Sequence, residues 1–269
     1  MINLTQVLVK TIDETLNKVI NDKCSVSRFG DGEFAMLMLL HTLRFQVIDT
    51  RLSLRLDEVI KSQLENHIVC LPPVFGDVDC LSDFWTWWVN SYGNMLNHYI
   101  DVNREYYNSY MSRLYLPSKD KSKVKALFDK AKLIWNNRDI VIVEGEKSRL
   151  GVGNDLFNNC KSIQRILCPA INAFFKYDEI LDEVKKQDAS KLILIALGPT
   201  ATVLAYDLCI EGYQAIDIGH IDLEYEWFLQ GATELCPVKN KYVDGSPDGI
   251  IVGEIHDMKY ESEIITTII

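Results

Sequence analysis

The sequence predicts an α/β protein with a Rossmann-like, mostly parallel sheet and helices on both of its faces. Short continuous apolar segments, such as 140–143 and 191–197, alternate with segments of helical period, such as 178–186 and 200–210. This alternation is typical of strands that are buried on both faces between helices. Since no internal repeat, low-complexity linker or shift in composition divides the 269 residues, we expect one domain over 1–269.

The elements are expected in the following order. Apolar residues three or four positions apart predict helices over 4–20, 34–40, 52–64, 121–136, 178–186, 200–210 and 223–229. Short apolar runs predict strands over 25–29, 67–71, 140–143, 162–168, 191–197 and 214–218. The aromatic-rich stretch 83–115 is expected to form helices with a tyrosine-rich surface. Ligands of such sheets bind beyond the carboxyl ends of the strands, so the turns that follow these strands are the candidate site.

Composition narrows the class of function. The chain has 28 basic and 38 acidic residues, a formal net charge of −10, which argues against a nucleic-acid-binding protein. Its seven cysteines show no C-x-x-C spacing, so neither a disulfide framework nor a zinc site is expected. The sequence has no signal-peptide pattern and no apolar run of the roughly 20 residues that span a bilayer. We therefore expect a cytoplasmic protein without a membrane span.

The first acidic turn follows the predicted strand 25–29 and reads Arg28-Phe29-Gly30-Asp31-Gly32-Glu33. Its two carboxylates suit a metal ligand, a catalytic base or an anchor for a sugar hydroxyl. The alternative is a helix start, where Gly30 or Asp31 is the N-cap and Glu33 interacts with the helix dipole. A helix cap does not require two glycines around one Asp and an Arg before them. We therefore favour the interpretation that this turn is part of a functional site.

The second acidic turn, 217–224, contains His220, Asp222 and Glu224. In an extended chain these three side chains point to one side, because strand side chains alternate with period two. One imidazole and two carboxylates form a plausible ligand set for Mn²⁺ or Mg²⁺. The alternative is that Asp222 caps the next helix while His220 is a buried, hydrogen-bonded histidine.

Three further turns are candidates for nucleotide contact. The segment 144–155 carries Gly151 and Gly153, whose backbone amides, with Lys147 and Arg149 nearby, suit a diphosphate; a surface loop is the alternative. The turn 198–200 has a glycine that permits close approach and Thr200 as a natural N-cap. In 168–173, Asn172 suits a base or ribose edge or, alternatively, a turn. Aromatic residues of 83–115 suit stacking on an acceptor sugar, although such spacing is more often a core feature.

Taken together, these motifs resemble the GT-D-type bacterial glycosyltransferases, first described as the domain of unknown function DUF1792. The resemblance covers roughly residues 20–235 in collinear stretches. The matching stretches are SRFGDGE (27–33), VEGE (143–146), SRLGVGNDLF (148–157), RILCPAINAF (165–174), ALGPTAT (196–202) and DIGHIDLEYEW (217–227).

The resemblance implies a Rossmann-like domain that transfers a hexose, with glucose as the expected sugar, from a UDP-sugar to a glycan acceptor on a bacterial adhesin. It also implies a divalent metal, Mn²⁺ or Mg²⁺, held by an Asp-x-Glu motif. Two such motifs occur, and the sequence does not decide between them. We favour Asp222 and Glu224 as metal ligands, and Asp31 and Glu33 as catalytic residues. The predicted nucleotide-sugar-binding residues are Arg28, Phe29, Gly30, Gly32, Glu144, Gly145, Lys147, Arg149, Gly151, Gly153, Asn154, Pro169, Asn172, Gly198, Pro199, Thr200 and His220.

Two other functions use the same residues. A phosphohydrolase would cleave a nucleotide sugar with water as the acceptor, and its turnover would not respond to a glycan. A non-catalytic nucleotide-sugar-binding protein would bind UDP tightly without turnover. The sequence determines neither the donor hexose and the acceptor, nor the stereochemistry, nor whether the chain forms a homo-oligomer.

Overall fold

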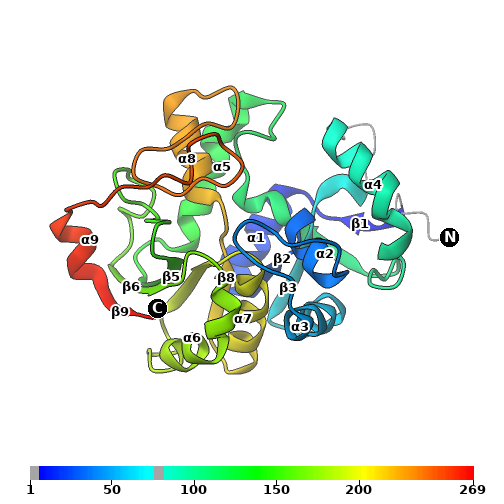
Figure 1. Ribbon diagram of the computed structural model, residues 1–269, viewed down its shortest axis with the longest axis horizontal. Helices are drawn as coiled ribbons and strands as arrows, with labels where there is room; N and C mark the ends of the chain where they lie inside the picture. Colours follow the sequence, from blue (N-terminus) through cyan, green and yellow to red (C-terminus); the bar gives the residue numbers. More distant parts are fainter. Residues whose placement is uncertain (1–5, 76–81) are drawn as a thin grey trace.

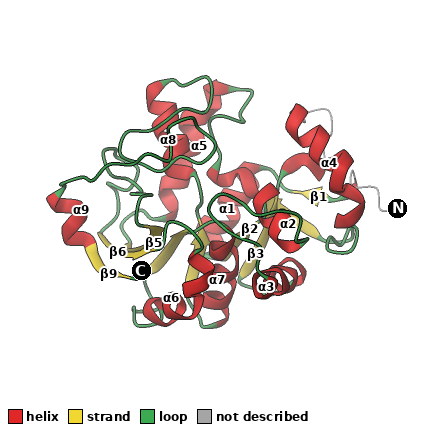
Figure 2. Cartoon of the chain, in the orientation of Figure 1, coloured by secondary structure: helices red, strands yellow, loops and turns green. Residues whose placement is uncertain are grey.

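The computed structural model describes residues 6–75 and 82–269, and their strands form one nine-stranded sheet (Figures 1 and 2). The order of the strands across the sheet is β1-β4-β3-β2-β8-β7-β5-β6-β9, and each neighbouring pair is parallel. The strands are β1 (Leu8–Val9), β2 (Ser25–Arg28), β3 (His67–Leu71), β4 (Glu105–Asn108), β5 (Asp139–Gly145), β6 (Ser162–Cys168), β7 (Leu192–Ala196), β8 (Gln214–Asp217) and β9 (Ile264–Thr267). The predicted fold class is confirmed.

Helices cover both faces of this sheet (Figure 1). The longer helices are α1 (Ile12–Asp22), α2 (Asp31–Leu37), α3 (Thr50–Lys61), α4 (Asp83–Leu96), α5 (Val124–Ala131), α6 (Tyr177–Val184), α7 (Pro199–Ile210), α8 (Ile221–Gln230) and α9 (Met258–Glu263). Short 3-10 turns lie at 73–75, 109–112, 121–123, 132–134 and 173–176.

Strand side chains alternate between two hydrophobic cores. In β5, Val141 and Val143 belong to the core that includes residues of α3, α6 and α7, whereas Ile140 and Ile142 belong to the core that includes residues of α1, α5 and α8. All four are fully buried. This two-sided burial explains why the central strands read as continuous apolar runs.

The largest differences from the predicted elements lie near the two ends of the chain. Residues 8 and 9 form β1, and helix α1 begins only at Ile12, because Thr11 and Glu14 form a capping box at that point. The aromatic stretch contains one helix, α4, but it continues into strand β4. The sequence reasoning also missed α9 and β9. The predicted helix 4–20 begins at residues that lie outside the described part.

Two smaller differences change the interpretation of the acidic turns. Helix α2 begins at Asp31, three residues earlier than predicted, so Asp31 and Glu33 lie in its first turn. Helix α8 begins at Ile221, so Asp222 and Glu224 are helical as well.

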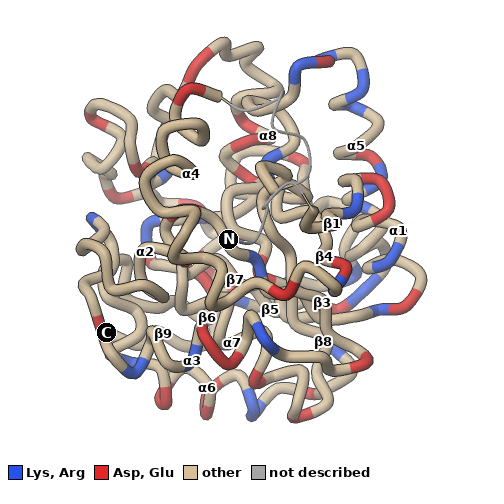
Figure 3. Tube along the Cα trace, turned by 90° about the vertical axis from the view of Figure 1, so that its right-hand side faces the viewer, with Lys and Arg blue, Asp and Glu red and all other residues tan. Residues whose placement is uncertain are grey.

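Figure 3 shows Lys and Arg residues interspersed with Asp and Glu residues along the helices and loops of the described chain. Among the residues that the structure describes, no helix combines the length and the apolar character needed to cross a bilayer.

Candidate active site

Charged and polar side chains converge where β2 and β8, neighbours in the sheet, reach their carboxyl ends. They come from β2, from the first turn of α2, from the residue after the 3-10 turn 109–112, from β8 and from the residue before α8. We call them the carboxyl-end cluster: Arg28, Asp31, Glu33, Arg113, Asp217 and His220.

Arg28 and Asp217 form the buried centre of this cluster. The Arg28 guanidinium donates from Nη2 to Oδ1 of Asp217 at 2.7 Å and from Nε to its backbone oxygen at 2.9 Å. Gly219, at φ +45°, makes room for that guanidinium, because a Cβ there would lie 1.9 Å from Nη2 of Arg28. Burial raises the pKa of Asp217 although Arg28 opposes the shift. Arg28, predicted to bind the nucleotide, is therefore held mainly by Asp217.

Asp31 and Glu33 lie beside this pair in different environments. Asp31 is exposed, whereas Glu33 is half-buried and its Oε2 accepts a hydrogen bond from the Gly30 amide at 2.8 Å. Burial, followed by the charge of Asp217, raises the pKa of Glu33 to about 7, while Arg28 opposes the shift. The capping alternative is thus partly correct for Glu33. A carboxyl group that titrates near neutral pH is also suited to general acid–base chemistry.

His220 and Arg113 complete the cluster. An Nη2 atom of Arg113 lies 3.3 Å from Nδ1 of His220. The charge of Arg113, together with burial and Arg28, lowers the pKa of His220 well below its usual value. Since a guanidinium can only donate, Nδ1 accepts, and the neutral ring carries its proton on Nε2. His220 therefore offers one N–H donor.

The expectation that His220, Asp222 and Glu224 share one face is wrong, because Asp222 and Glu224 are on helix α8. Residues two apart on a helix point in different directions. Oδ1 of Asp222 accepts from the Gly151 amide and from Nδ2 of Asn154, both at 2.8 Å, and its Oδ2 accepts from Nζ of Lys241 at 2.6 Å.

Lys241 is buried and also contacts Oε1 of Glu226 at 3.0 Å. Nδ2 of Asn154 donates to the same Oε1 at 2.7 Å. We call these residues the α8 anchor: Gly151, Asn154, Asp222, Glu226 and Lys241. The Lys241 ammonium thus lies beside Asp222, one of the two carboxylates where a metal cation was expected.

Glu224 points toward another loop. Its Oε2 accepts from the amides of Tyr115 and Leu116 at 2.8 and 2.7 Å. Its Oε1 is buried without a hydrogen-bond partner in the described residues. Burial raises its pKa. Glu224 therefore fixes the backbone that follows Arg113, and it shares no bound group with Asp222.

The loop after β5 is held by internal contacts. Glu144 is fully buried, where Oε1 contacts Nη1 of Arg165 at 2.6 Å and Oε2 accepts from the Leu150 amide at 2.7 Å. Arg149 is also buried, and its Nη1 donates to the backbone oxygens of Asn240 and Gly253. Both were predicted nucleotide contacts, but both oxygens of Glu144 and Nη1 of Arg149 bind the protein itself, while Nε of Arg149 has no partner in the described residues. Lys147 is half-buried, and its backbone oxygen accepts from the Tyr242 amide.

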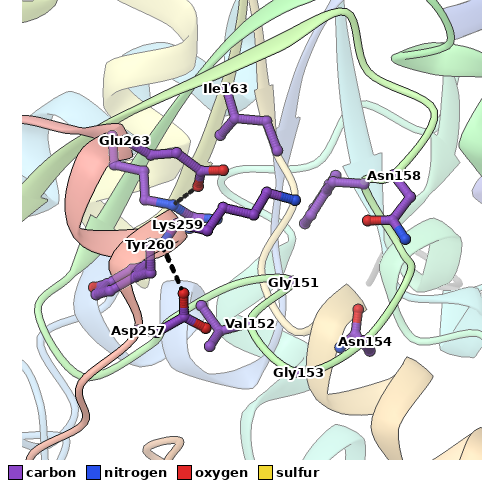
Figure 4. A pocket seen from close by; sticks show the side chains of 12 residues that line it. Gly151, Val152, Gly153, Asn154, Asn158, Ile163, Asp257, Lys259, Tyr260 and Glu263 are labelled. Carbon is purple, nitrogen blue, oxygen red and sulfur yellow. Dashed lines mark hydrogen bonds and ion pairs between the residues drawn. The ribbon is translucent and has the colours of Figure 1, made fainter.

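The two glycines of the predicted diphosphate cradle differ. Gly151, at φ +76°, has Phe157 where a Cβ would lie, 2.5 Å from Cδ2 of that ring, so its small size serves packing. Gly153, at φ +84°, has open space there. Both line a cavity of about 230 Å³ between this loop and α9, which Figure 4 shows with the Lys259 side chain extending into it. Asn154, on its wall, belongs to the α8 anchor.

The turns after β6 and β7 are filled by a loop over residues 39–48. A Cβ on Gly198, at φ +55°, would lie 2.5 Å from the ring of Phe45. The Val47 amide donates to Oδ1 of Asn172, and the Asn172 amide donates to the backbone oxygen of Phe45. The residue that caps α7 is Gly198, which corrects the predicted N-cap at Thr200. Thr200 is fully buried in the first turn of α7, with its Oγ1 unpartnered in the described residues.

The remaining residues that were predicted to bind the nucleotide sugar contribute to packing or allow the chain to turn. Phe29 is fully buried against Phe34, with 5.6 Å between ring centroids. Gly32 lies close to Leu43, and Gly145 lies close to the backbone around Pro169 and Ala170. Pro199 is buried at the first position of α7.

The aromatic stretch divides into core and surface. Trp85 and Trp88 are buried, and Nε1 of Trp85 donates to the Tyr110 hydroxyl at 2.7 Å, next to the carboxyl-end cluster. Phe84 and Trp87 are 47% and 55% exposed, which leaves their predicted role in acceptor binding open.

The predicted site residues therefore fall into two groups. Arg28, Asp31, Glu33 and His220 come together, whereas the loop 144–154 lies at β5 and β6. The two groups are linked through α8, because the Gly151 amide and Nδ2 of Asn154 donate to Asp222, two residues after His220. Sequence reasoning missed Arg113 and Lys241, because neither has a motif around it. Asp217 lay within a quoted motif, directly at a strand end, which was a usable signal.

Comparison with known proteins agrees with this architecture. A family model described as the glycosyltransferase GT-D fold matches residues 26–246. The chain is 42% identical to glycosyltransferase GlyD of Streptococcus pneumoniae serotype 4 over 268 residues, and 38% identical to the probable glycosyl transferase Gly of Streptococcus gordonii over 267 residues. These matches cover 97% and 98% of this chain. The chain spans only 32% and 39% of the length of these two relatives.

Two solved structures match over nearly their whole length. One is a domain of unknown function 1792 described as having a distinct glycosyltransferase fold, with a TM-score of 0.92 and 38% identity over 98% of this chain and 96% of the other. The second is described as a new glycosyltransferase (DUF1792) from Streptococcus sanguinis, with a TM-score of 0.90 and 36% identity over 98% of this chain and 100% of the other.

Proposed function

This chain belongs to the family of glycosyltransferases with the GT-D fold, and we propose that it transfers a hexose from a UDP-sugar to a glycan acceptor with a divalent cation. The observation that carries this proposal is the carboxyl-end cluster. It places an exposed carboxylate, Asp31, beside a half-buried one, Glu33, at the edge where parallel sheets bind ligands.

Asp31 fits a cation site better than Asp222 does. Within the described residues, the Asp31 carboxylate accepts no protein hydrogen bond, whereas both oxygens of Asp222 have protein donors. No group of three or more His, Cys, Asp or Glu side chains in that part of the chain could hold a metal. A Mg²⁺ or Mn²⁺ ion commonly uses one or two carboxylates and takes its other oxygens from phosphates and water. We therefore move the proposed metal contact from Asp222 and Glu224 to Asp31.

Such a cation, when bound, would offset the negative charge of the departing diphosphate. The protein's own residues carry the rest of the proposed chemistry. In an inverting transfer, the Glu33 carboxylate accepts the proton of the acceptor hydroxyl while the acceptor oxygen bonds to the sugar C1. The bond from C1 to the phosphate oxygen breaks, and UDP leaves with that electron pair. Arg28 and Asp217 hold the ends of β2 and β8 together, and α2, which carries Glu33 in its first turn, begins three residues after Arg28.

The finer parts of the proposal follow the family resemblance. We propose glucose as the hexose and a glycan on a bacterial adhesin as the acceptor. A cytoplasmic location belongs to the same proposal, because the described cysteines are free thiols, as in a reducing compartment.

The decisive experiment measures UDP release from UDP-glucose, with and without a glycan acceptor, in Mn²⁺ or in EDTA. We expect wild-type release to require Mn²⁺ and to rise when acceptor is present. Asp31→Asn should raise the Mn²⁺ concentration for half-maximal activity at least tenfold, because it removes a charged ligand. Asp222→Asn, assayed at a temperature where it remains folded, should leave that concentration unchanged.

Each of the other outcomes would contradict a different part of the proposed function. Release that acceptor does not stimulate would favour a phosphohydrolase. Tight UDP binding without turnover on a broad acceptor panel would favour a non-catalytic binding protein. A metal requirement that shifts in Asp222→Asn and not in Asp31→Asn would restore the original assignment.

A further inference from the structure

Among the residues that the structure describes, the Arg113 guanidinium has no oxygen partner, although the chain is strongly acidic. The other described arginines each contact a carboxylate or a carbonyl oxygen, namely Arg28, Arg44, Arg51, Arg55, Arg104, Arg138, Arg149 and Arg165. Within the described residues, the Arg113 guanidinium has one polar contact, from Nη2 to Nδ1 of His220 at 3.3 Å. That partner is neutral. The charge of Arg113 also acts on Glu224, whose pKa it lowers against the effect of burial, but the two groups form no ion pair in the described residues. A half-buried guanidinium in this state is suited to bind an anion.

The backbone that carries Arg113 is held from three directions. The Arg113 amide donates to the backbone oxygen of Tyr110 at 2.9 Å, and the Tyr110 amide donates to Oδ1 of Asn108 at 2.9 Å. On the other side, Oε2 of Glu224 accepts from the amides of the two residues at 115 and 116. A buried carboxylate that binds two consecutive amides restricts this turn. The guanidinium is therefore presented from a fixed position, which reduces the entropy lost when it binds a ligand.

Arg113 also belongs to the cluster that contains the proposed reaction centre. Its amide donates to the backbone oxygen of Tyr110, whose pKa is raised by burial and on whose hydroxyl the charges of Arg113 and Asp31 act in opposite directions. His220 contacts Arg113 and lies two residues after Ile218, directly beyond the end of β8. The Nε2–H of His220 is a second donor in the same place. Two donors, one of them a guanidinium, thus belong to the same cluster as the proposed cation ligand, Asp31.

We propose that Arg113 binds the diphosphate of the nucleotide leaving group through two N–H donors, and that His220 positions its guanidinium. This inference rests on the proposed function, because it assumes a nucleoside diphosphate as the departing group. The flat guanidinium matches two oxygens of one phosphate, which a lysine ammonium cannot do. The contact becomes stronger as negative charge develops on the leaving oxygen, so it lowers the barrier of the transfer.

The test compares Arg113→Gln and Arg113→Lys with wild type by calorimetry of UDP, inorganic pyrophosphate and uridine binding in Mn²⁺. We expect Arg113→Gln to weaken UDP and pyrophosphate binding by about tenfold to a hundredfold, because one charge-assisted pair is lost. Uridine binding should not change. Arg113→Lys should lie in between, since it keeps the charge without the paired donors. In turnover, kcat should fall more than KM rises.

Arg44→Gln is the matched control, because Arg44 is an exposed arginine, 63% accessible, with a distant contact of 3.9 Å to Asp244. It should bind all three ligands as wild type does. Melting curves identify any loss of affinity that comes from unfolding, and Arg113→Lys gives a second, milder variant.

Three outcomes would overturn the inference, and they differ in which other conclusions they reject. Wild-type UDP affinity and kcat in Arg113→Gln would reject the role of Arg113 and leave the proposed function intact. A wild-type protein that binds neither UDP nor pyrophosphate would reject both this inference and the proposed donor class. An equal loss of uridine and UDP affinity would show that Arg113 shapes the pocket and does not contact phosphate.

Discussion

The two Asp-x-Glu motifs of this chain have the same spacing, follow neighbouring strands and begin helices, yet their surroundings differ. At α2, Asp31 is exposed and Glu33 keeps one oxygen without a donor in the described residues. At α8, a lysine, an asparagine and a backbone amide occupy both oxygens of Asp222. One motif is open to a ligand, whereas the other connects three segments of the protein. An acidic motif therefore indicates a ligand site only where the fold leaves its oxygens both unpaired and accessible, since the unpaired Oε1 of Glu224 is fully buried in the described part of the chain.

The comparison predicts different consequences of mutation at the two motifs. Changes at α2 should remove activity and leave the fold intact. Changes at α8 should weaken the fold and act on activity only through it.

The largest expected effect is that of Glu33→Gln. Loss of a general base typically costs 10²- to 10⁴-fold in rate, and the glutamine oxygen can still accept from the Gly30 amide. Because the carboxylate is the active form, wild-type kcat/KM should rise with pH around a pKa of about 7. The variant should lack this dependence. A pH–rate profile checks the result, and an unchanged profile in Glu33→Gln would assign the titration to another group.

The same raised pKa predicts the pH dependence of stability. A carboxyl group whose pKa is higher in the folded state binds more protons there, so its contribution is full below pH 4.5 and is lost as pH rises to about 7. Over this window the free energy of unfolding of wild type should fall relative to that of Glu33→Gln. Urea unfolding of both proteins at pH 4.5 and pH 8 measures the difference.

Next in size is the effect of Asp222→Asn on stability. The buried Lys241 ammonium would keep Glu226 but lose its closer carboxylate, and breaking a buried ion pair costs about 3 kcal/mol or more. Urea unfolding should show this loss, and the double variant Asp222→Asn/Lys241→Met should recover part of it because no unpaired charge remains. A variant that is as stable as wild type would show that the α8 anchor is not structural.

The smallest expected effect is that of Gly153→Ala. Its left-handed backbone at φ +84° costs an alanine about 1 kcal/mol, while the new Cβ meets no atom within 4 Å. UDP affinity, measured by calorimetry, should stay within twofold of wild type. As a comparison, Gly151→Ala should destabilise more, because its Cβ would lie 2.5 Å from Phe157. A large loss of UDP affinity in Gly153→Ala would restore the predicted diphosphate cradle.

Much of the fold followed from local patterns in the sequence. Strands 67–71 and 162–168 were predicted with their observed bounds, and β5, β7 and β8 within two residues at each end. Buried parallel strands contain continuous apolar runs, and such runs can be recognised in the amino-acid sequence alone. Strand β4 was missed because its tyrosines resemble the aromatic helix before it, and α9 and β9 lie in a segment with weak periodicity.

The sequence by itself determined the fold class, the strand ends that carry the charged turns, and four residues of the carboxyl-end cluster: Arg28, Asp31, Glu33 and His220. It could do so because apolar periodicity and glycines at strand ends are local properties. Tertiary structure alone decided which acidic motif stays open. Lys241 contacts Asp222, 19 residues away in the sequence, and Arg113 contacts His220, 107 residues away. Hydrogen-bond and charge pairing depends on distance in space, and no pattern within a short window records which donors the folded chain brings to a given carboxylate.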